Sequence, residues 1–143
     1  LLRDADLPLL GTVRYAPVIF QRYVDADLDL RVTVVEDEIF AAAISSEAQY
    51  AADYRPGLGS ARVTRHDLPP VIAERLLELM RIFGLRFGAI DLRVTPDGDY
   101  VFLEVNPAGE FLFISQRIDL PIPQAIAASL ERHDRARSDC GPC

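Results

Sequence analysis

The chain has 143 residues, half of them hydrophobic, so it is long enough for one domain with a proper buried core. It carries 15 basic residues, all of them arginine, against 22 acidic ones, and the net charge of −7 argues against a general nucleic-acid surface. No run of uncharged apolar residues reaches the length of a membrane span, and the start lacks the features of a signal peptide. We therefore expect a cytoplasmic protein with no membrane partner.

The first part of the chain is predicted to lead into a sheet. Residues 1–16 show no clear period and are interpreted as a linker or a truncated start. Residues 17–24 are predicted to form a buried strand because several of them are apolar. Two further strands are predicted over residues 29–35, where apolar and polar residues alternate, and over residues 39–44.

The next segments are predicted to be a long polar connection and a helix. Residues 45–67 form the connection, and a loop of this length inside a compact domain is usually functional or mobile. Residues 71–83 carry apolar positions at helical spacing, with Asp67 as the expected cap and Gly84 as the expected end. The last segments are interpreted as a loop, a second amphipathic helix and a disordered tail: residues 107–115, 122–132 and 133–143.

A hairpin is predicted between the two helices. Residues 86–95 and 100–105 are rich in β-branched and aromatic residues, and the Asp97-Gly98 dipeptide between them favours a tight turn. A turn centred there is expected to oppose these residues: Thr95 and Tyr100, and Asp91 and Glu104. Antiparallel hairpins bracketed by helices indicate an α+β fold, a layered antiparallel sheet with flanking helices.

The hairpin is predicted to have one apolar and one polar face, because side chains alternate along a strand. The expected core face carries these residues: Ile90, Leu92, Val94, Val101, Leu103 and Val105. On the other face Asp91 lies opposite Glu104, and Asn106 lies beside them. Like charges directly opposite on a sheet repel, so a positive group is expected between them.

A hard divalent cation is the best candidate for that positive group. Magnesium accepts one or two carboxylates together with phosphate oxygens, and Asn106 adds a neutral amide oxygen. The sequence therefore predicts a metal site formed by Asp91, Glu104 and Asn106. The alternative is an exposed acidic face neutralised by Arg93 or by water.

Three separated stretches resemble one family. FQRYVDADLDLRVTVV, DYR and GAIDLRV…FLEVNPAGEF occur in that order and are similar to the C-terminal part of ATP-grasp ligases. Within that superfamily they most resemble the microviridin-type, or graspetide, ribosomal peptide maturases, with the ribosomal-protein glutamate ligases as relatives. The match covers about residues 16–130, so the resemblance implies an ATP-grasp C-terminal subdomain over residues 17–132.

The resemblance also implies ATP and Mg²⁺ as cofactors. In such enzymes, residues matching Asp91, Glu104 and Asn106 hold one or two magnesium ions on the β- and γ-phosphates. Arg31 and Arg55 fall where the family places phosphate or acyl-phosphate contacts, a task that suits a forked guanidinium.

A second implied site is the hinge that hydrogen-bonds adenine through its backbone. The matching residues are Gln21, Tyr23 and Val24. Family members often carry glutamate after the glutamine, whereas this chain has Arg22. That departure weakens a side-chain role at this position more than it weakens nucleotide binding.

The implied activity is ATP-dependent ligation of a carboxylate to an amine or hydroxyl through an acyl phosphate. The implied substrate is a peptide or protein that carries carboxylate side chains, and the product would be an ester or amide cross-link in a ribosomal precursor peptide. Family members carry phosphate-contacting lysines in an earlier half, and this chain has no lysine, so an incomplete enzyme is expected.

Other functions stay open at this stage. The chain could be a non-catalytic module that binds a peptide or partner, or an amino-acid ligase that acts on a protein. A homodimer is also left open.

The remaining reactive side chains carry less weight. Cys140 and Cys143 could form a redox pair or half a zinc site, but neither a following helix nor further ligands are evident, so a reduced tail is expected. His66 and His133 have no partners for a catalytic triad at suggestive positions and are expected to be surface residues.

Overall fold

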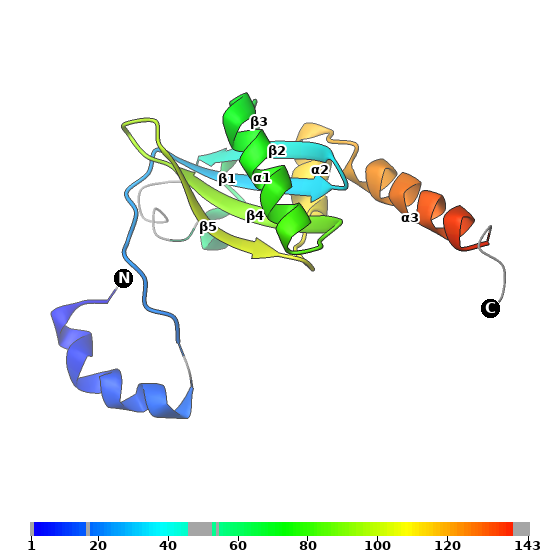
Figure 1. Cartoon of the computed structure of the whole chain (residues 1–143). Coiled ribbons are helices and arrows are strands. Elements are labelled where there is room, and N and C mark those ends of the chain that lie inside the picture. The colour runs from blue at the N-terminus through cyan, green and yellow to red at the C-terminus, as the bar shows by residue number, and fades with distance from the viewer. Residues whose placement is uncertain (1, 17, 46–52, 54, 139–143) are drawn as a thin grey trace.

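The chain folds around a five-stranded antiparallel sheet with the strand order β3-β2-β1-β4-β5 (Figure 1). The computed structural model describes residues 2–16, 18–45, 53 and 55–138. The strands have these bounds: β1 Leu28–Val35, β2 Glu38–Ser45, β3 Arg62–Arg65, β4 Phe87–Val94 and β5 Tyr100–Asn106. The predicted α+β class and the antiparallel sheet are confirmed.

Helices lie on both faces of the sheet. Figure 1 shows α1 crossing the front of the sheet, α2 behind it, and α3 extending beyond it. The helical segments have these bounds: η1 Asp4–Tyr15, η3 Arg55–Gly57, α1 Pro70–Ile82, α2 Leu112–Ile118 and α3 Ile122–Ser138. Over the described residues, none of these helices combines the length and apolar character that crossing a bilayer requires.

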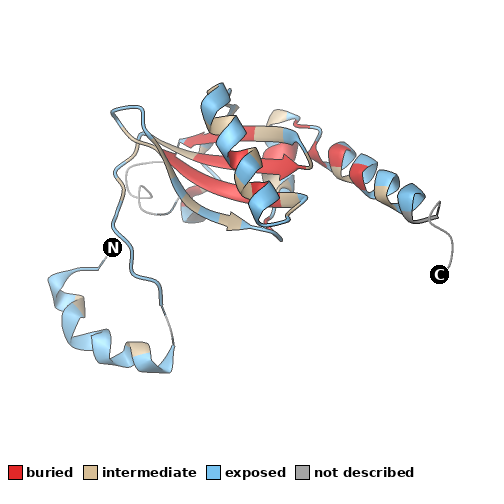
Figure 2. Cartoon of the chain, in the orientation of Figure 1, coloured by how far each residue is buried: buried red, intermediate tan, exposed pale blue. Residues whose placement is uncertain are grey.

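The sheet is buried on both sides, and each side has its own apolar cluster. On one face Leu30, Val32 and Ile90 pack with Leu76 and Met80 of α1. On the other face the buried residues come from the sheet, from α2 and α3, and from the connection between these helices: Val35, Ala42, Ile114, Leu120, Ile122 and Ala125. Figure 2 accordingly shows the central strands as buried. Because β1 and β4 are central and covered on both faces, any polar side chain on them needs a partner within the protein.

Strand pairing in the hairpin is as predicted at Asp91 and differs near the turn. Asp91 lies opposite Glu104, as expected, but Val94, not Thr95, lies opposite Tyr100. A β-bulge between Asp91 and Leu92 causes this shift, because one extra residue on β5 changes the register beyond it.

The bulge also corrects the predicted core face. Ile90, Leu92 and Val94 do pack in the α1 cluster. Val101, however, pairs with Arg93 and therefore shares the polar face. Leu103 lines a pocket together with Arg93 rather than packing beneath α1.

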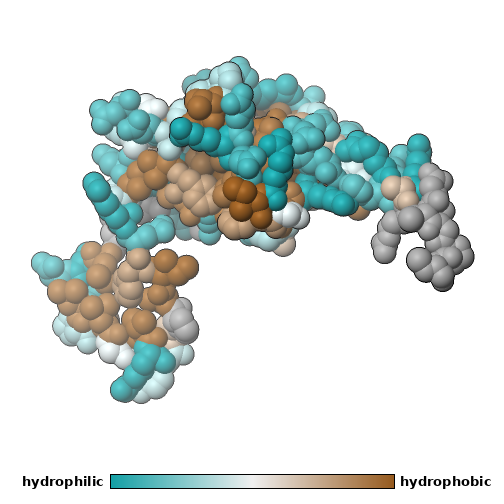
Figure 3. Space-filling model, in the orientation of Figure 1, coloured by the Kyte–Doolittle hydropathy of each residue, from teal (hydrophilic) through white to brown (hydrophobic). Residues whose placement is uncertain are grey.

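The segment before β1 is not the buried strand that was predicted for residues 17–24. Its described residues form no helix or strand, and Val18, Ile19 and Phe20 are all more than half exposed. Apolar content alone misled the prediction, since a strand also needs a paired neighbour for its backbone groups. The preceding helix η1 likewise has no buried residue and lies apart from the sheet in Figure 1. Hydrophobic side chains are visible on its surface in Figure 3.

Three other predicted boundaries change. The predicted connection over residues 45–67 contains η3 and β3, and the predicted loop over residues 107–115 gives way to α2 at Leu112. Helix α3 continues to Ser138, past the predicted end at residue 132. Asp67 does not cap α1, which begins after Pro69 without a side-chain cap. Gly84 follows the end of α1 with a left-handed φ of 64°, as expected of a terminating glycine.

Candidate functional site

A row of polar side chains crosses the central strands on the face that α2 and α3 cover. Register sets Arg31 of β1 beside Asp91 of β4, and Asp91 beside Glu104 of β5. The next pair towards the start of β1 is Asp29 with Arg93. Successive pairs on one face are two residues, or about 7 Å, apart along the strand. The strands therefore hold two charged pairs in a line.

Arg31 and Asp91 form a buried ion pair at the centre of this row. The Arg31 Nη1 donates to Asp91 Oδ1 at 2.9 Å, and the two residues are only 7% and 6% exposed. The Arg31 Nη2 also donates to the carbonyl of Glu110 at 2.9 Å. Arg31 is thus a positive group beside Asp91 on this face, whereas Arg93, which the alternative interpretation supposed, pairs with Asp29. Arg31 is therefore buried on the sheet and not exposed to solvent.

The carboxylate pocket lies at the β5 side of this pair. It has a volume of about 490 Å³ and is lined by these residues: Arg31, Leu58, Glu104, Asn106, Ala108, Glu110 and Phe113. The amide oxygen of Asn106 accepts a hydrogen bond from the N–H of Ala108 at 2.9 Å, which fixes the Asn106 side chain beside Glu104. Carboxylate and amide oxygens therefore face one cavity that also carries an arginine.

The oxygen donors of this pocket fit a magnesium ion. Glu104 and Asn106 line the cavity, and Asp91 is the cross-strand neighbour of Glu104 on the same face. Magnesium prefers one or two carboxylates together with waters and phosphate oxygens, and the chemistry of these three side chains matches that preference. Within the described residues no cluster of three His, Cys, Asp or Glu forms a metal site, and the predicted trio differs from such a cluster because it includes an asparagine.

Gly109 lets the loop after β5 pass over the buried ion pair. A Cβ added at Gly109 would overlap the Cβ of Ala89 and would lie 2.9 Å from Arg31 Nη2. This close approach is what brings the carbonyl of Glu110 within hydrogen-bond distance of Arg31. Glycine is required at this position because a side chain would clash, and not because the backbone has a positive φ.

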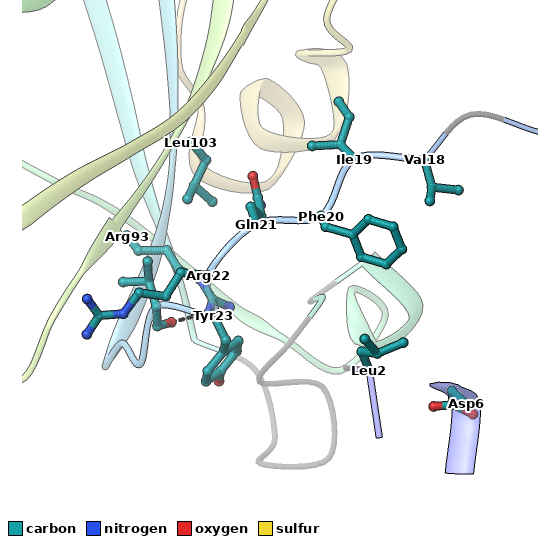
Figure 4. Close-up of a pocket in the computed structure, with 11 residues that line it drawn as sticks. Leu2, Asp6, Val18, Ile19, Phe20, Gln21, Arg22, Tyr23, Arg93 and Leu103 are labelled. Carbon is teal, nitrogen blue, oxygen red and sulfur yellow. Dashed lines mark hydrogen bonds between the residues drawn. The ribbon is translucent and has the colours of Figure 1, made fainter. Parts of the chain in front are cut away.

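The hinge pocket lies at the other end of the polar row (Figure 4). It has a volume of about 530 Å³, within the range of small-molecule sites. Its lining consists of these residues: Leu2, Asp6, Val18, Ile19, Phe20, Gln21, Arg22, Tyr23, Val24, Arg93 and Leu103. The structure therefore brings the predicted residues Gln21, Tyr23 and Val24 into one pocket, on an irregular segment and not on a strand.

Arg93 joins this segment to the sheet. Its Nε donates to Asp29 Oδ1 at 2.8 Å and its Nη1 donates to the carbonyl of Val24 at 2.6 Å. Burial raises the pKa of Asp29, and the hydrogen bond from Arg93 acts in the opposite direction. Burial by itself would lower the pKa of Arg93, but the hydrogen bond and charge of Asp29 raise it.

Some predicted residues cannot be placed in the site. The backbone of Arg55 lies in η3, but its side chain is outside the described part, as are Cys140 and Cys143. The two histidines are partly exposed, and each has a hydrogen-bond partner that the sequence did not indicate. His66 Nε2 lies 2.9 Å from the Tyr100 hydroxyl, and His133 Nε2 lies 2.8 Å from Glu36.

Sequence reasoning missed four residues that shape the site: Asp29, Arg93, Gly109 and Glu110. Arg93 and Asp29 sit at polar positions of alternating strands, so a register-based search for opposite charges could have paired them. Glycine in the loop directly after Glu104 and Asn106 was a signal of close backbone approach. Nothing in the sequence pattern marked the carbonyl of Glu110, because a backbone contact leaves no trace in residue type.

Comparison with known proteins gives matches among solved structures. No family model matches the chain, and no curated protein matches it. The macrocyclase MdnC from Microcystis aeruginosa MRC, crystallised with the precursor peptide MdnA, is 41% identical with a TM-score of 0.78, and the match covers 91% of this chain and 41% of MdnC.

Two more structures agree with that match. A RiPP-associated ATP-grasp ligase from Chryseobacterium gregarium, in complex with ADP and a leader and core peptide, is 29% identical with a TM-score of 0.80, covering 99% of this chain and 42% of that one. The macrocyclase MdnB from Microcystis aeruginosa MRC is 35% identical with a TM-score of 0.63, covering 89% and 45%. This chain thus spans less than half the length of the proteins it matches. The predicted resemblance to part of the ATP-grasp peptide maturases is confirmed.

Proposed function

We propose that this chain, which has the fold of part of the RiPP-associated ATP-grasp ligases, forms the nucleotide- and magnesium-binding part of a ligase that modifies a peptide. The observation that carries the proposal is the polar row with a pocket at each end. The hinge pocket would receive the adenine, and the carboxylate pocket would receive the phosphates. The match to the Chryseobacterium gregarium ligase, which was solved in complex with ADP, covers 99% of this chain and supports this arrangement.

The residues of the two pockets would contact the base, the metal and the phosphates. Gln21, Tyr23 and Val24 would form one wall of the base site. Glu104 and Asn106, with Asp91, would hold magnesium, which when bound would neutralise charge on the β- and γ-phosphates. Arg31 also lines this pocket and would lie near the phosphates, with Arg55 as a further predicted contact.

The proposed reaction has two steps, phosphorylation of the carboxylate and displacement of the phosphate. A carboxylate oxygen of the substrate forms a bond to the γ-phosphorus while the bond from that phosphorus to ADP breaks, which gives an acyl phosphate. A hydroxyl or amine then bonds to the acyl carbon, phosphate leaves, and the nucleophile loses its proton. The first step brings two anions together and the second expels a phosphate anion, so the arginine-bearing pocket would act by electrostatic stabilisation rather than by supplying a nucleophile.

The peptide substrate is proposed from the matched proteins. MdnC was crystallised with the precursor peptide MdnA, and the Chryseobacterium gregarium ligase with a leader and core peptide. By the same logic a peptide with carboxylate side chains would be the substrate here. Each cross-link would lower the mass of the peptide by that of one water, because the displaced oxygen leaves with the phosphate. Mass spectrometry of an acidic peptide encoded near this gene, after incubation with ATP, would detect that loss.

Titration calorimetry with magnesium and a non-hydrolysable ATP analogue tests the metal and nucleotide site. In the protein as its gene encodes it, we expect Glu104→Gln and Asn106→Ala each to weaken analogue binding about tenfold, because each removes a magnesium ligand. Asp97→Asn is the matched control, since it removes a carboxylate from the turn of the same hairpin. Wild-type affinity in both ligand variants would contradict the metal assignment, and no binding to the wild type would contradict the proposed function.

A further inference from the structure

Arg93 makes three interactions that reach from the sheet into the hinge pocket. Its guanidinium pairs with Asp29, donates to the carbonyl of Val24, and lies 5.3 Å from the centre of the Tyr23 ring. Arg93 as a whole is only 5% exposed, so these contacts occur away from bulk water. One arginine therefore holds two consecutive residues of the pocket wall.

The segment that lines the hinge pocket depends on such contacts because it has no regular secondary structure. Residues 18–27 form no helix or strand. Among the described residues, one backbone hydrogen bond ties this segment to the sheet, from the N–H of Asp27 to the carbonyl of Val94 at 2.9 Å. Residues nearer the pocket depend on side-chain contacts, and the Arg93 bond to Val24 is short and charge-assisted.

Asp29 fixes the direction of the guanidinium. Its carboxylate takes the Nε edge of Arg93, so the Nη1 edge is left pointing at Val24. Lysine could keep the charge beside Asp29, but it cannot reproduce a planar fork that serves two acceptors and stacks on a ring. The geometry is therefore specific to arginine and not only to positive charge.

We infer that Arg93 is a positioning residue that fixes the base-facing segment 21–24 and so sets the nucleobase selectivity of the hinge pocket. The inference rests on the proposed function and goes beyond it, because it concerns which base the pocket accepts. Adenine presents an amino donor where guanine presents a carbonyl acceptor. A wall of backbone groups can distinguish them only if those groups are held in place.

Competition binding of ATP and GTP to the protein as its gene encodes it, in the presence of magnesium, tests this inference. We expect the wild type to bind ATP more tightly than GTP. In Arg93→Lys the ratio of the two affinities should fall about tenfold, because ATP binding weakens. Hydrogen exchange at the amides of residues 21–24 should become faster in the variant, because the segment loses its hold. Arg65→Lys is the matched control: Arg65 also donates to two carbonyls, those of Ile118 and Asp119, but lies outside both pockets.

The outcomes separate the inference from the proposed function. Reduced base preference in Arg93→Lys with an unchanged preference in Arg65→Lys supports a positioning role. Wild-type preference and wild-type exchange in a folded Arg93→Lys protein overturn the inference alone. No nucleotide binding by the wild type overturns the proposed function and the inference with it. If circular dichroism shows that Arg93→Lys does not fold, Asp29→Asn replaces it, with the same two outcomes, because it frees the Arg93 fork from its fixed direction.

Discussion

Gly109 lies where the loop after β5 crosses Ala89 and the guanidinium of Arg31. Its backbone occupies space that any side chain would need. The loop could avoid a clash only by lifting away, and this would break the hydrogen bond from Arg31 to the Glu110 carbonyl. A single hydrogen atom in place of a methyl group thus determines how the pocket is closed on this side.

We expect Gly109→Ala to lower the free energy of unfolding by about 1–3 kcal/mol, the usual cost of an extra methyl group in a packed region. Urea denaturation of the variant and the wild type measures this difference. Adding Ala89→Gly should restore part of the loss, because it removes one of the two groups that the new Cβ meets. Gly59→Ala is the control, since a Cβ there has nothing within 4 Å. Equal stability of Gly109→Ala and the wild type would refute the close approach.

Helix α3 is joined to the β1–β2 turn through Glu36. Ser129 Oγ donates to Glu36 Oε1 at 2.6 Å, and His133 Nε2 lies 2.8 Å from the same oxygen. The hydrogen bond from Ser129, with that from His133, lowers the pKa of Glu36 below its ordinary value of 4.5 although partial burial acts against this. Glu36 also has a φ of 55°, so the turn directs its side chain from a constrained backbone.

The lowered pKa predicts a pH-dependent contribution of this contact to stability. A carboxylate whose pKa falls on folding stabilises the protein above its unfolded pKa of about 4.5, and the contribution is lost as pH falls through the folded pKa. We therefore expect Glu36→Gln to lower the free energy of unfolding by about 1 kcal/mol near neutral pH, and the difference from the wild type to shrink in acid. Denaturation at about pH 7 and about pH 3.5 measures both values.

The neighbouring carboxylate provides the control for that prediction. Asp37 lies 3.7 Å from Arg81, and both side chains are more than half exposed, so Asp37→Asn should change stability by only a few tenths of a kcal/mol. A difference between Glu36→Gln and the wild type that stays constant with pH would show that the Glu36 charge does not stabilise the docking of α3.

Elements with strong local signals could be predicted from the sequence, and those that depend on distant contacts could not. The hairpin was found because alternation and the Asp97-Gly98 turn agree, and Asp91 does lie opposite Glu104. The bulge was missed because nothing in the residue types distinguishes an extra residue from a paired one. The segment before β1 was predicted wrongly because apolar residues there line a pocket and do not pair with a strand.

At the scale of the whole molecule, the site is a product of strand register. The pairs Asp29 with Arg93 and Arg31 with Asp91 are neighbouring rungs of β1 and β4, and β5 adds Glu104. The acidic members were recognisable in the sequence by their spacing. The assignment of arginines to partners was not, because both arginines lie on the same face and only the three-dimensional register decides which carboxylate each one meets.

Consecutive residues of β5 line the two pockets, Leu103 the hinge pocket and Glu104 the carboxylate pocket. A nucleotide with a triphosphate would contact both pockets, whereas AMP would fill chiefly the first. We therefore expect a non-hydrolysable ATP analogue with magnesium to raise the thermal unfolding temperature more than AMP does. A ligand at 100 times its dissociation constant stabilises by about 2.7 kcal/mol, so equal concentrations should reveal a difference in affinity as a difference in shift.

Removal of the metal tests which pocket causes that difference. Chelation of magnesium should reduce the shift with the ATP analogue and leave the shift with AMP unchanged, because magnesium would act at the β- and γ-phosphates, which AMP lacks. Glu104→Gln should have the same selective effect, since it alters one pocket and keeps the hinge segment intact. Thermal scans of both proteins with each ligand, with and without chelator, provide the comparison. Equal shifts with AMP and the ATP analogue under all conditions would mean that the carboxylate pocket takes no part in nucleotide binding.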